Sequence, residues 1–188
     1  MSVGHLQKPE GRLSDAFGVA IDQGSSLGEA IGIARGPAAR QDDLFTFKRA
    51  AVEVLSTEAS VILIDSEFGR QLLPSIAPGC DAQLAFEADA YGISDVDRMT
   101  KLPEHLKIAD LPHMGIRRLK FFTYYAPRGH HGINAKKHEL VRRLGEECGV
   151  HGIEFLFEPL VYDEHIRDQS GARFAALKPI NADHYWIG

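Results

Sequence analysis

Five short apolar runs rich in Val, Ile, Leu and Phe recur along this chain of 188 residues. Each is too short for a helix of ordinary length, and polar residues seldom interrupt it, which is typical of strands that are covered on both faces. The runs are residues 17–22, 61–65, 83–88, 119–125 and 154–162.

Helical patterns lie between these runs. Residues 41–57 and 135–149 carry apolar side chains at spacings of three and four, with polar residues opposite. A shorter helix is predicted near Ser26, because Ser26 and Glu29 have the spacing of a capping box, and another over 104–110. Strand and helix alternating in this order predict one domain, 1–188, with a parallel sheet and right-handed crossovers.

The first run indicates how the sheet is arranged. Gly18, Ala20 and Asp22 share one face of the strand, and the larger Val19 and Ile21 share the other. Small residues inside and large ones outside suit a closed barrel. A doubly wound sheet can produce the same pattern, but the barrel is favoured.

Two of the runs contain an ionisable residue where a parallel sheet would bury it. Lys120 shares a strand face with Phe122 and Tyr124, and Glu158 lies in the fifth run. The two can therefore meet inside a closed sheet, where burial and pairing would tune proton transfer. The alternatives are a structural ion pair, or a lysine whose stem packs while its ammonium group reaches solvent.

Acidic residues also gather at the ends of the apolar runs. Asp22, Asp65, Glu158 and Asp163 each stand at or near such an end. In barrels and open α/β sheets, ligands bind outside the carboxyl ends of the strands, so a substrate is expected there. The alternative is that polar residues simply resume where strands end.

Composition excludes several classes of partner. The chain has 26 acidic and 21 basic residues and a formal charge of −5, without a basic stripe interleaved with aromatics, so we expect no nucleic acid. No run approaches the length of a membrane helix and the start lacks a signal-peptide core, so we expect a cytoplasmic protein without a membrane partner. Cys80 and Cys148 fit no zinc or redox spacing and are predicted to be reduced thiols.

Five ordered motifs resemble the tagatose 1,6-bisphosphate aldolase family. They are Gly-Val-Ala-Ile-Asp-Gln at 18–23, Val-Ile-Leu-Ile-Asp at 61–65, Lys-Phe-Phe-Thr-Tyr-Tyr at 120–125, Arg-Leu-Gly-Glu-Glu-Cys at 143–148, and the run from 154 to 163. The resemblance extends over about 17–179. It implies a (β/α)8 TIM barrel and a class I aldolase, which cleaves a ketohexose bisphosphate reversibly to dihydroxyacetone phosphate and glyceraldehyde 3-phosphate through a lysine Schiff base, without a metal or other cofactor.

The resemblance also implies roles for individual residues. Asp22 and Gln23 match the positions that hold substrate, and Glu158 matches the glutamate that takes part in proton transfer. Lys120 matches the lysine of the fourth strand. Asp65, at the same end of the sheet, is expected to contact substrate as well.

One departure limits the resemblance. The family's imine-forming lysine lies on a sixth strand, whereas the tail 180–188 does not match the family. The barrel is therefore expected to be incomplete, with about five βα units and open first and fifth strands. Either a second copy covers these strands or the structure is a fragment. Lys48, Lys136 and Lys137 are interpreted as surface helix positions, and Lys120 is expected not to form the imine.

Three other functions stay open. The chain can be a non-catalytic or truncated fragment that acts as a binding or oligomerising module. It can also be an aldolase for another phosphosugar or a sulfosugar phosphate. Metal-dependent aldol chemistry, suggested by nine histidines including His130 and His131, is less favoured because adjacent histidines usually point apart.

Overall fold

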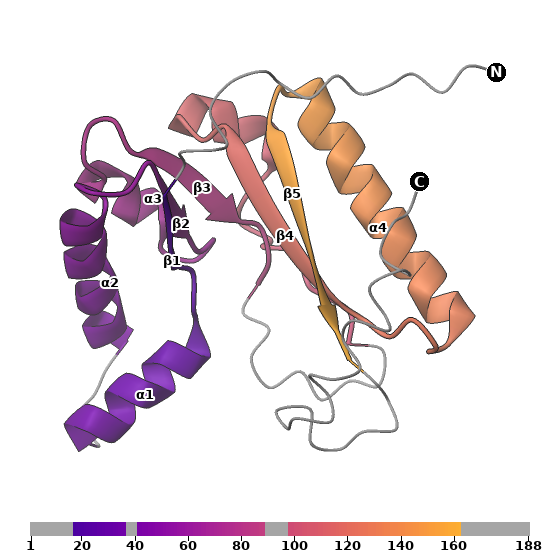
Figure 1. Ribbon diagram of the computed structural model, residues 1–188, viewed down its shortest axis with the longest axis horizontal. Coiled ribbons are helices and arrows are strands. Elements are labelled where there is room, and N and C mark those ends of the chain that lie inside the picture. The colour runs from indigo at the N-terminus through magenta and orange to yellow at the C-terminus, as the bar shows by residue number, and fades with distance from the viewer. Residues whose placement is uncertain (1–16, 37–40, 89–97, 163–188) are drawn as a thin grey trace.

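The computed structural model describes residues 17–36, 41–88 and 98–162 (Figure 1). A single sheet of five parallel strands forms its centre. The strands are β1 (Gly18–Ile21), β2 (Val61–Ile64), β3 (Asp81–Ala85), β4 (Arg118–Tyr125) and β5 (Glu154–Val161). The helices are α1 (Ser25–Arg35), α2 (Gln41–Leu55), α3 (Gly69–Leu72) and α4 (His131–Val150), with short 3₁₀ helices at Leu73–Ser75 and Ile108–Met114.

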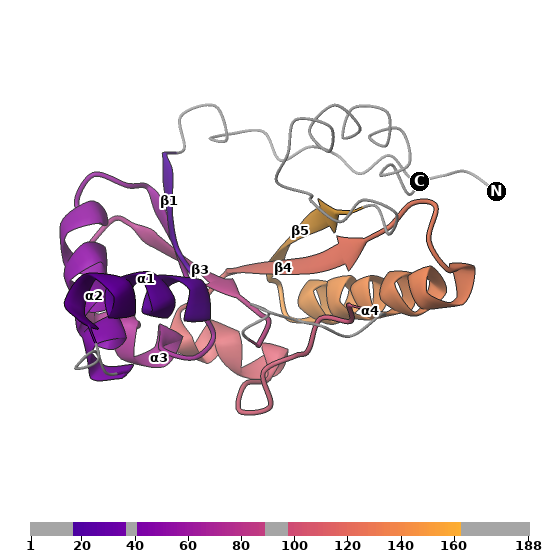
Figure 2. The same ribbon diagram turned by 90° about the horizontal axis from the view of Figure 1, so that it is seen from below.

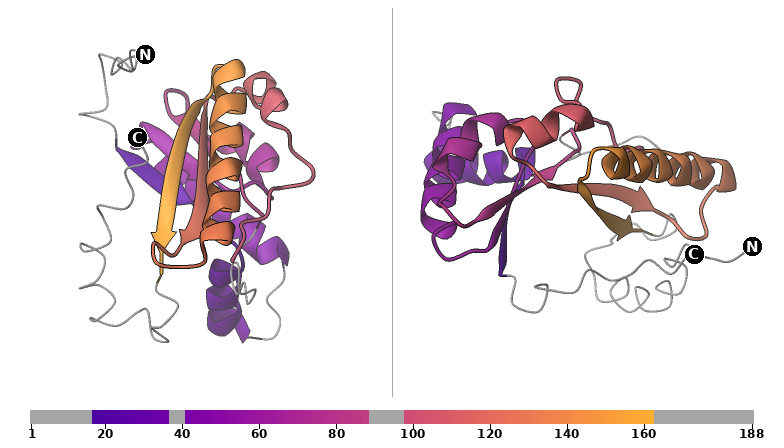
Figure 3. Two further views of the ribbon diagram at one scale, coloured as in Figure 1. Left: turned by 90° about the vertical axis from the view of Figure 1, so that its right-hand side faces the viewer. Right: turned by 90° about the horizontal axis from the view of Figure 1, so that it is seen from above.

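The strands lie in the sheet in the same order as in the sequence. A doubly wound sheet reverses its strand order at a switch point, so this order is that of a barrel. Figures 2 and 3 show a strongly curled sheet with the helices on its outer side. The prediction of a TIM-barrel architecture with about five βα units is confirmed for the described part of the chain.

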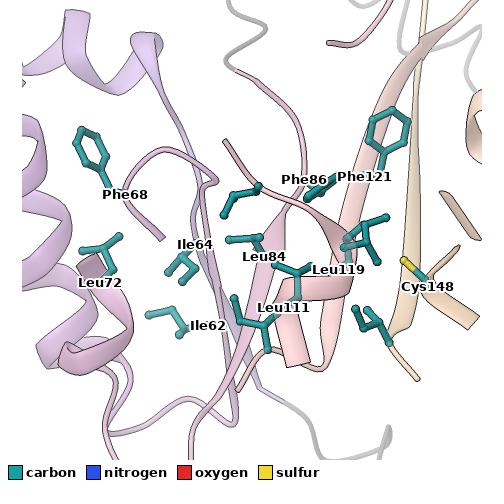
Figure 4. Close-up of a cluster of buried hydrophobic side chains, with 14 of the residues drawn as sticks. Ile62, Ile64, Phe68, Leu72, Leu84, Phe86, Leu111, Leu119, Phe121 and Cys148 are labelled. Atoms are coloured by element: carbon teal, nitrogen blue, oxygen red, sulfur yellow. The ribbon is translucent and has the colours of Figure 1, made fainter. Parts of the chain in front are cut away.

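Side chains alternate between the two faces of the sheet and so separate the core from the site. The outward residues pack against the helices, as Figure 4 shows for Ile62 and Ile64 of β2, Leu84 of β3 and Leu119 of β4. All four are fully buried. Because strand side chains have a period of two, the positions between them point to the inner face, which is where the predicted site residues lie.

Two predicted helix details are wrong. Helix α1 begins at Ser25, and its N-cap is Gly24, without a side-chain cap, so Ser26 does not form the expected capping box. The predicted helix over 104–110 is a turn followed by the 3₁₀ helix Ile108–Met114. This segment contains Pro112, which lacks the N–H group that an α-helix interior needs, and it ends at Gly115 in the left-handed conformation.

Lys48 and Lys137 are not surface residues, which corrects the sequence interpretation. Lys48 is 0% exposed and Lys137 is 1% exposed. Lys48 lies four residues from both Leu44 and Val52, on the helix face that packs against the core. Lys137 lies seven residues before the buried Leu144, so its position in the apolar stripe outweighed its charge. Lys136 is exposed, as expected.

The two edges of the described sheet are β1 and β5. Large apolar side chains are exposed on or beside both edges: Phe17 before β1, and Leu156 and Phe157 on β5. Within the described residues, no helix is sufficiently long and apolar to cross a membrane. Both cysteines are free thiols, as predicted, and the atypical tail 180–188 lies outside the described residues.

Candidate active site

Lys120 stands at the centre of a cluster of carboxylates on the inner face of the sheet. Its ammonium group donates hydrogen bonds to Asp22 Oδ2 at 3.0 Å and to Glu87 Oε1 at 2.9 Å. Glu158 Oε2 lies 3.2 Å from the same nitrogen and forms an ion pair with it, but the Glu158 side chain is 52% exposed, so the prediction that it is buried is wrong. The structure therefore brings Lys120 and Glu158 together, as strand alternation predicted, and adds Asp22 and Glu87.

Strand register explains this meeting. Lys120 on β4 pairs with Ala85 on β3, and Phe122, two residues further along β4, pairs with Glu158 on β5. Glu87 follows Ala85 by two residues and is level with Phe122 and Glu158. The side chain of Lys120 extends about two residues along the sheet toward the carboxyl ends of the strands. Its ammonium group therefore lies beside both glutamates.

The lysine is held in its charged form. Burial by itself lowers the pKa of Lys120, but attraction and hydrogen bonds from Glu87 and Asp22 outweigh burial and raise the pKa above its ordinary value. An amine with a raised pKa carries almost no neutral, nucleophilic form at pH 7. Lys120 is therefore suited to hold an oxygen atom of a ligand by charge, and poorly suited to attack a carbonyl carbon.

Glu87 has the opposite property, because it is easily protonated. Burial raises its pKa to about 7, although the Lys120 ammonium group and the main-chain amide of Phe122 lower it and Asp22 raises it further. Its Oε2 atom is buried and accepts no hydrogen bond from the described residues. Ser66 donates to the main-chain carbonyl of Glu87 at 2.7 Å and so fixes the position of this residue. A group with such a pKa can both take up and release a proton at neutral pH.

Sequence reasoning missed Glu87, although a signal for it was present. The third apolar run included this residue, and its alternation puts Gln83, Ala85 and Glu87 on one strand face. Unlike the acids that stand at the ends of other runs, this glutamate lies within the third run. Its burial at 8% exposure results from tertiary packing.

Asp65 lies beside this cluster and already has two partners. Lys48 Nζ donates to Asp65 Oδ2 at 2.5 Å, and the main-chain amide of Phe68 donates to Oδ1 at 2.7 Å. The ammonium group of Lys48 also lies 5.6 Å from the centre of the Phe68 ring. The pair thus anchors the turn after β2, which forms one wall of the site.

A cavity of about 480 Å³ opens over these side chains. It is lined by all of the predicted site residues and by Glu87 and Lys48. Gln23 is exposed at its edge. Phe122, Tyr124 and Leu160 supply apolar surface next to the charged groups, a combination that suits a small polar molecule with a carbon backbone.

The described residues contain no cluster of three His, Cys, Asp or Glu side chains that is suitable for a metal ion. His130, one of the pair at 130 and 131, caps helix α4, since its Nδ1 atom accepts a hydrogen bond from the Gly132 amide at 3.2 Å. His130 therefore has a structural role as the N-cap of α4.

Comparison with known proteins agrees with this geometry. The sequence model of the family described as "DeoC/LacD family aldolase" matches residues 17–183. A tagatose 1,6-diphosphate aldolase of Listeria monocytogenes serotype 4a (strain HCC23) is 32% identical over 172 residues, which cover 89% of this chain and 51% of the relative. Tagatose 1,6-diphosphate aldolase 1 of Streptococcus pyogenes serotype M3 (strain SSI-1) is 31% identical over 161 residues, 86% of this chain and 50% of the relative. The chain thus spans about half the length of these relatives, and it belongs to the DeoC/LacD aldolase family.

Proposed function

We propose that the cavity binds a phosphorylated ketose and takes part in its reversible aldol cleavage. The substrate we infer is tagatose 1,6-bisphosphate or a related ketose phosphate, cleaved to dihydroxyacetone phosphate and glyceraldehyde 3-phosphate. The observation that carries this proposal is the charged Lys120, held by three carboxylates at the floor of a cavity in a chain of an aldolase family.

In this proposal the carboxylates move the proton that cleavage requires. When the C3–C4 bond of the ketose breaks, its electron pair moves toward the imine nitrogen, and the C4 hydroxyl becomes an aldehyde by losing its proton. Glu158, at the cavity, and Glu87, with a pKa of about 7, are the two groups that we assign to this proton. Lys120 holds the hydroxyl oxygen, and Asp22 and Gln23 bind further hydroxyls.

The imine-forming lysine, in this proposal, lies outside the described residues. Both lysines that line the cavity, Lys48 and Lys120, have carboxylate partners and are unsuited to nucleophilic attack. Asp65 is assigned a positioning role rather than a direct contact with substrate, because both of its oxygens already accept hydrogen bonds.

Borohydride trapping tests this assignment. The full chain is incubated with dihydroxyacetone phosphate and borohydride, and the adduct is mapped by mass spectrometry. We expect no adduct on Lys48 or Lys120, and any adduct to map outside residues 17–162. An adduct on Lys120 would contradict its assigned role. If the chain neither forms an adduct nor binds dihydroxyacetone phosphate, the alternative of a non-catalytic module is the better one.

A panel of substrates separates the related enzyme functions. Tagatose 1,6-bisphosphate, other ketose bisphosphates and a sulfosugar phosphate differ in hydroxyl stereochemistry or in the terminal anion. Cleavage of the first at the highest kcat/KM supports the substrate we infer, whereas a clear preference for the sulfosugar phosphate would replace it.

We also propose that a second copy of the chain covers β1 and β5, the edges of the sheet that the described residues form. Unpaired edge strands invite pairing with another chain, and proteins normally cover or charge them. The exposed Phe17 beside β1 and the exposed Leu156 and Phe157 on β5 support this proposal, because they add apolar surface at both edges. Sedimentation equilibrium over a range of concentrations tests it.

A further inference from the structure

Arg98 lies at the end of the sheet where the strands have their carboxyl termini. The amide of Ala88, directly after Glu87, donates to the carbonyl of Lys101 at 2.8 Å, so the chain returns to the end of β3 just after Arg98. The guanidinium carbon of Arg98 lies 4.4 Å from the ring centre of Tyr162 and 5.4 Å from that of Tyr124. Tyr124 lines the cavity, so Arg98 lies next to one of the lining residues without lining the cavity itself.

The guanidinium N–H groups of Arg98 donate no hydrogen bond to an acceptor among the described residues. No carboxylate among them pairs with its guanidinium group, in contrast to Lys48 and Lys120. Contact with aromatic rings occupies the faces of a guanidinium group, while its five N–H donors lie in its plane and match two oxygens of a phosphate. The backbone of Arg98 has a φ of 42°, in the left-handed region that residues other than glycine rarely adopt.

The local charge around Arg98 differs from that at the centre of the site. Around Lys120 there are three carboxylates for one ammonium group, so an anion there would meet like charges. A phosphate group of a substrate is therefore better placed away from Lys120, at a cation without a carboxylate partner. Among the described residues, Arg98 has no carboxylate partner and lies beside Tyr124, which lines the cavity, so it fits that requirement.

The distance along β4 suits a sugar phosphate. Glu158 is level with Phe122, and Tyr124 is two residues further toward the mouth, about 7 Å at the usual rise of a strand. A substrate whose hydroxyl contacts Glu158 can span this distance with two or three carbon atoms and a phosphate ester. Phe122 and Tyr124, whose rings are 5.7 Å apart, supply an apolar wall for those carbons.

We propose that Arg98, supported by Tyr124 and Tyr162, is an anion-binding residue that takes the terminal phosphate, or another tetrahedral oxyanion, of the substrate. This inference rests on the proposed function, which it deepens by naming the group that holds the charged end of the substrate.

Phosphate titrations at constant ionic strength test the proposal. Inorganic phosphate, dihydroxyacetone phosphate and neutral dihydroxyacetone are each titrated into the full chain, and binding is followed by NMR, including the assigned Nε–H resonance of Arg98. The variants are Arg98→Gln and Arg98→Lys. Arg117→Gln is the matched control, because Arg117 is exposed just before β4, at the opposite end of that strand, and its loss changes the net charge equally.

We expect Arg98→Gln to lower the affinity for inorganic phosphate and for dihydroxyacetone phosphate by about tenfold. This is the usual effect of losing a charge-assisted hydrogen bond. The phosphate affinity of Arg98→Lys should lie between that of Arg98→Gln and that of the wild type. The affinity for neutral dihydroxyacetone should be the same in all three proteins. Arg117→Gln should change phosphate affinity by less than about twofold, as expected for a distant, screened surface charge.

Three results would overturn the proposal. Equal losses in Arg98→Gln and Arg117→Gln would indicate a nonspecific effect of charge. If Arg98→Gln binds inorganic phosphate more weakly but binds dihydroxyacetone phosphate as well as the wild type does, the site binds a free anion and not the substrate. An Nε–H resonance of wild-type Arg98 that does not shift with phosphate also refutes the proposal, and this measurement needs no variant to fold. Failure of the aldolase proposal is distinguishable, because it appears in imine trapping and turnover while phosphate binding through Arg98 persists.

Discussion

Glu87 accepts a hydrogen bond from the Lys120 ammonium group through Oε1 at 2.9 Å, while its buried Oε2 atom accepts none from the described residues. This one-sided contact explains why two neighbouring groups respond differently to burial. Lys120 has carboxylate partners in Asp22, Glu87 and Glu158 and stays charged. Glu87 has a single cation, which it shares, and its pKa rises to about 7.

Replacing Glu87 by Gln should change how stability depends on pH. The folded-state pKa of Glu87 is raised from 4.5 to about 7, so its neutral form is favoured in the folded protein. The stability that Glu87 contributes relative to Gln is fully present below pH 4.5 and is lost as pH rises to about 7. The loss is at most roughly 3 kcal/mol, from the size of the shift. Urea unfolding of both proteins between pH 4 and pH 8 measures it.

Glu58→Gln is the control for this prediction, since Glu58 is exposed just after α2. Glu58→Gln should not show a stability difference from the wild type that changes between pH 4 and pH 8. A stability difference between wild type and Glu87→Gln that stays constant from pH 4 to pH 8 would show that Glu87 titrates at an ordinary value.

Replacing Lys120 by Met should destabilise the fold at pH 7 and raise the pKa of Glu87 further. The substitution removes the charge that lowers the pKa of Glu87 and leaves three carboxylates close together. Breaking such a pair costs about 3–5 kcal/mol when it is fully buried, and we expect about 2–3 kcal/mol here because the cavity is open to solvent. Urea unfolding gives the first quantity, and carbon NMR of labelled glutamate gives the second. Lys136→Met, at an exposed position of α4, should have little effect, and an equally small effect at Lys120 would contradict the prediction.

Lys48 and Asp65 should prove strongly coupled in a double-mutant cycle. Lys48→Met leaves Asp65 in a largely buried position with only the Phe68 amide, and Asp65→Asn leaves a fully buried ammonium group without its carboxylate. Each single change should cost about 3 kcal/mol, and the double change should cost less than their sum by at least about 1 kcal/mol. Additive effects, measured by urea unfolding, would mean that the ion pair contributes nothing beyond packing.

Phe157→Lys should weaken self-association if a second copy covers the edge of β5. Phe157 is 37% exposed on this edge strand, and a lysine there opposes pairing by charge and by loss of apolar area. We expect the dimer dissociation constant to rise by about tenfold, which corresponds to the burial of a large part of one aromatic side chain. Val150→Lys, at an exposed position that ends α4, is the control. A wild-type chain that remains monomeric at high micromolar concentration would refute the proposal itself.

The sequence predicted most of the fold because its signals were local. The run at 119–125 became β4 (Arg118–Tyr125), and the run at 154–162 became β5 (Glu154–Val161). Alternation within these two strands was enough to predict that Lys120 and Glu158 face each other. The first run and the family resemblance favoured a barrel over a doubly wound sheet, and the strand order in the structure confirms it.

The rest of the site depended on packing between distant segments. The helical pattern around Lys48 does not reveal its partner, because Asp65 lies 17 residues away and is brought to it by the turn after β2. Arg98 carries no sequence motif, and its relation to Tyr124 and Tyr162 arises only when the chain returns to the end of β3. Such residues are found by their contacts and not by their spacing.

The carboxylates around Lys120 belong to three separate parts of the sheet: Asp22 follows β1, Glu87 follows β3 and Glu158 lies on β5. A molecule that touches all three can bind only when the strands are docked in register, so part of its binding free energy becomes folding stability. If phosphosugars bind as proposed, they should therefore protect the backbone amides of β1 and β5 together from hydrogen exchange, although these strands lie at opposite margins of the described sheet.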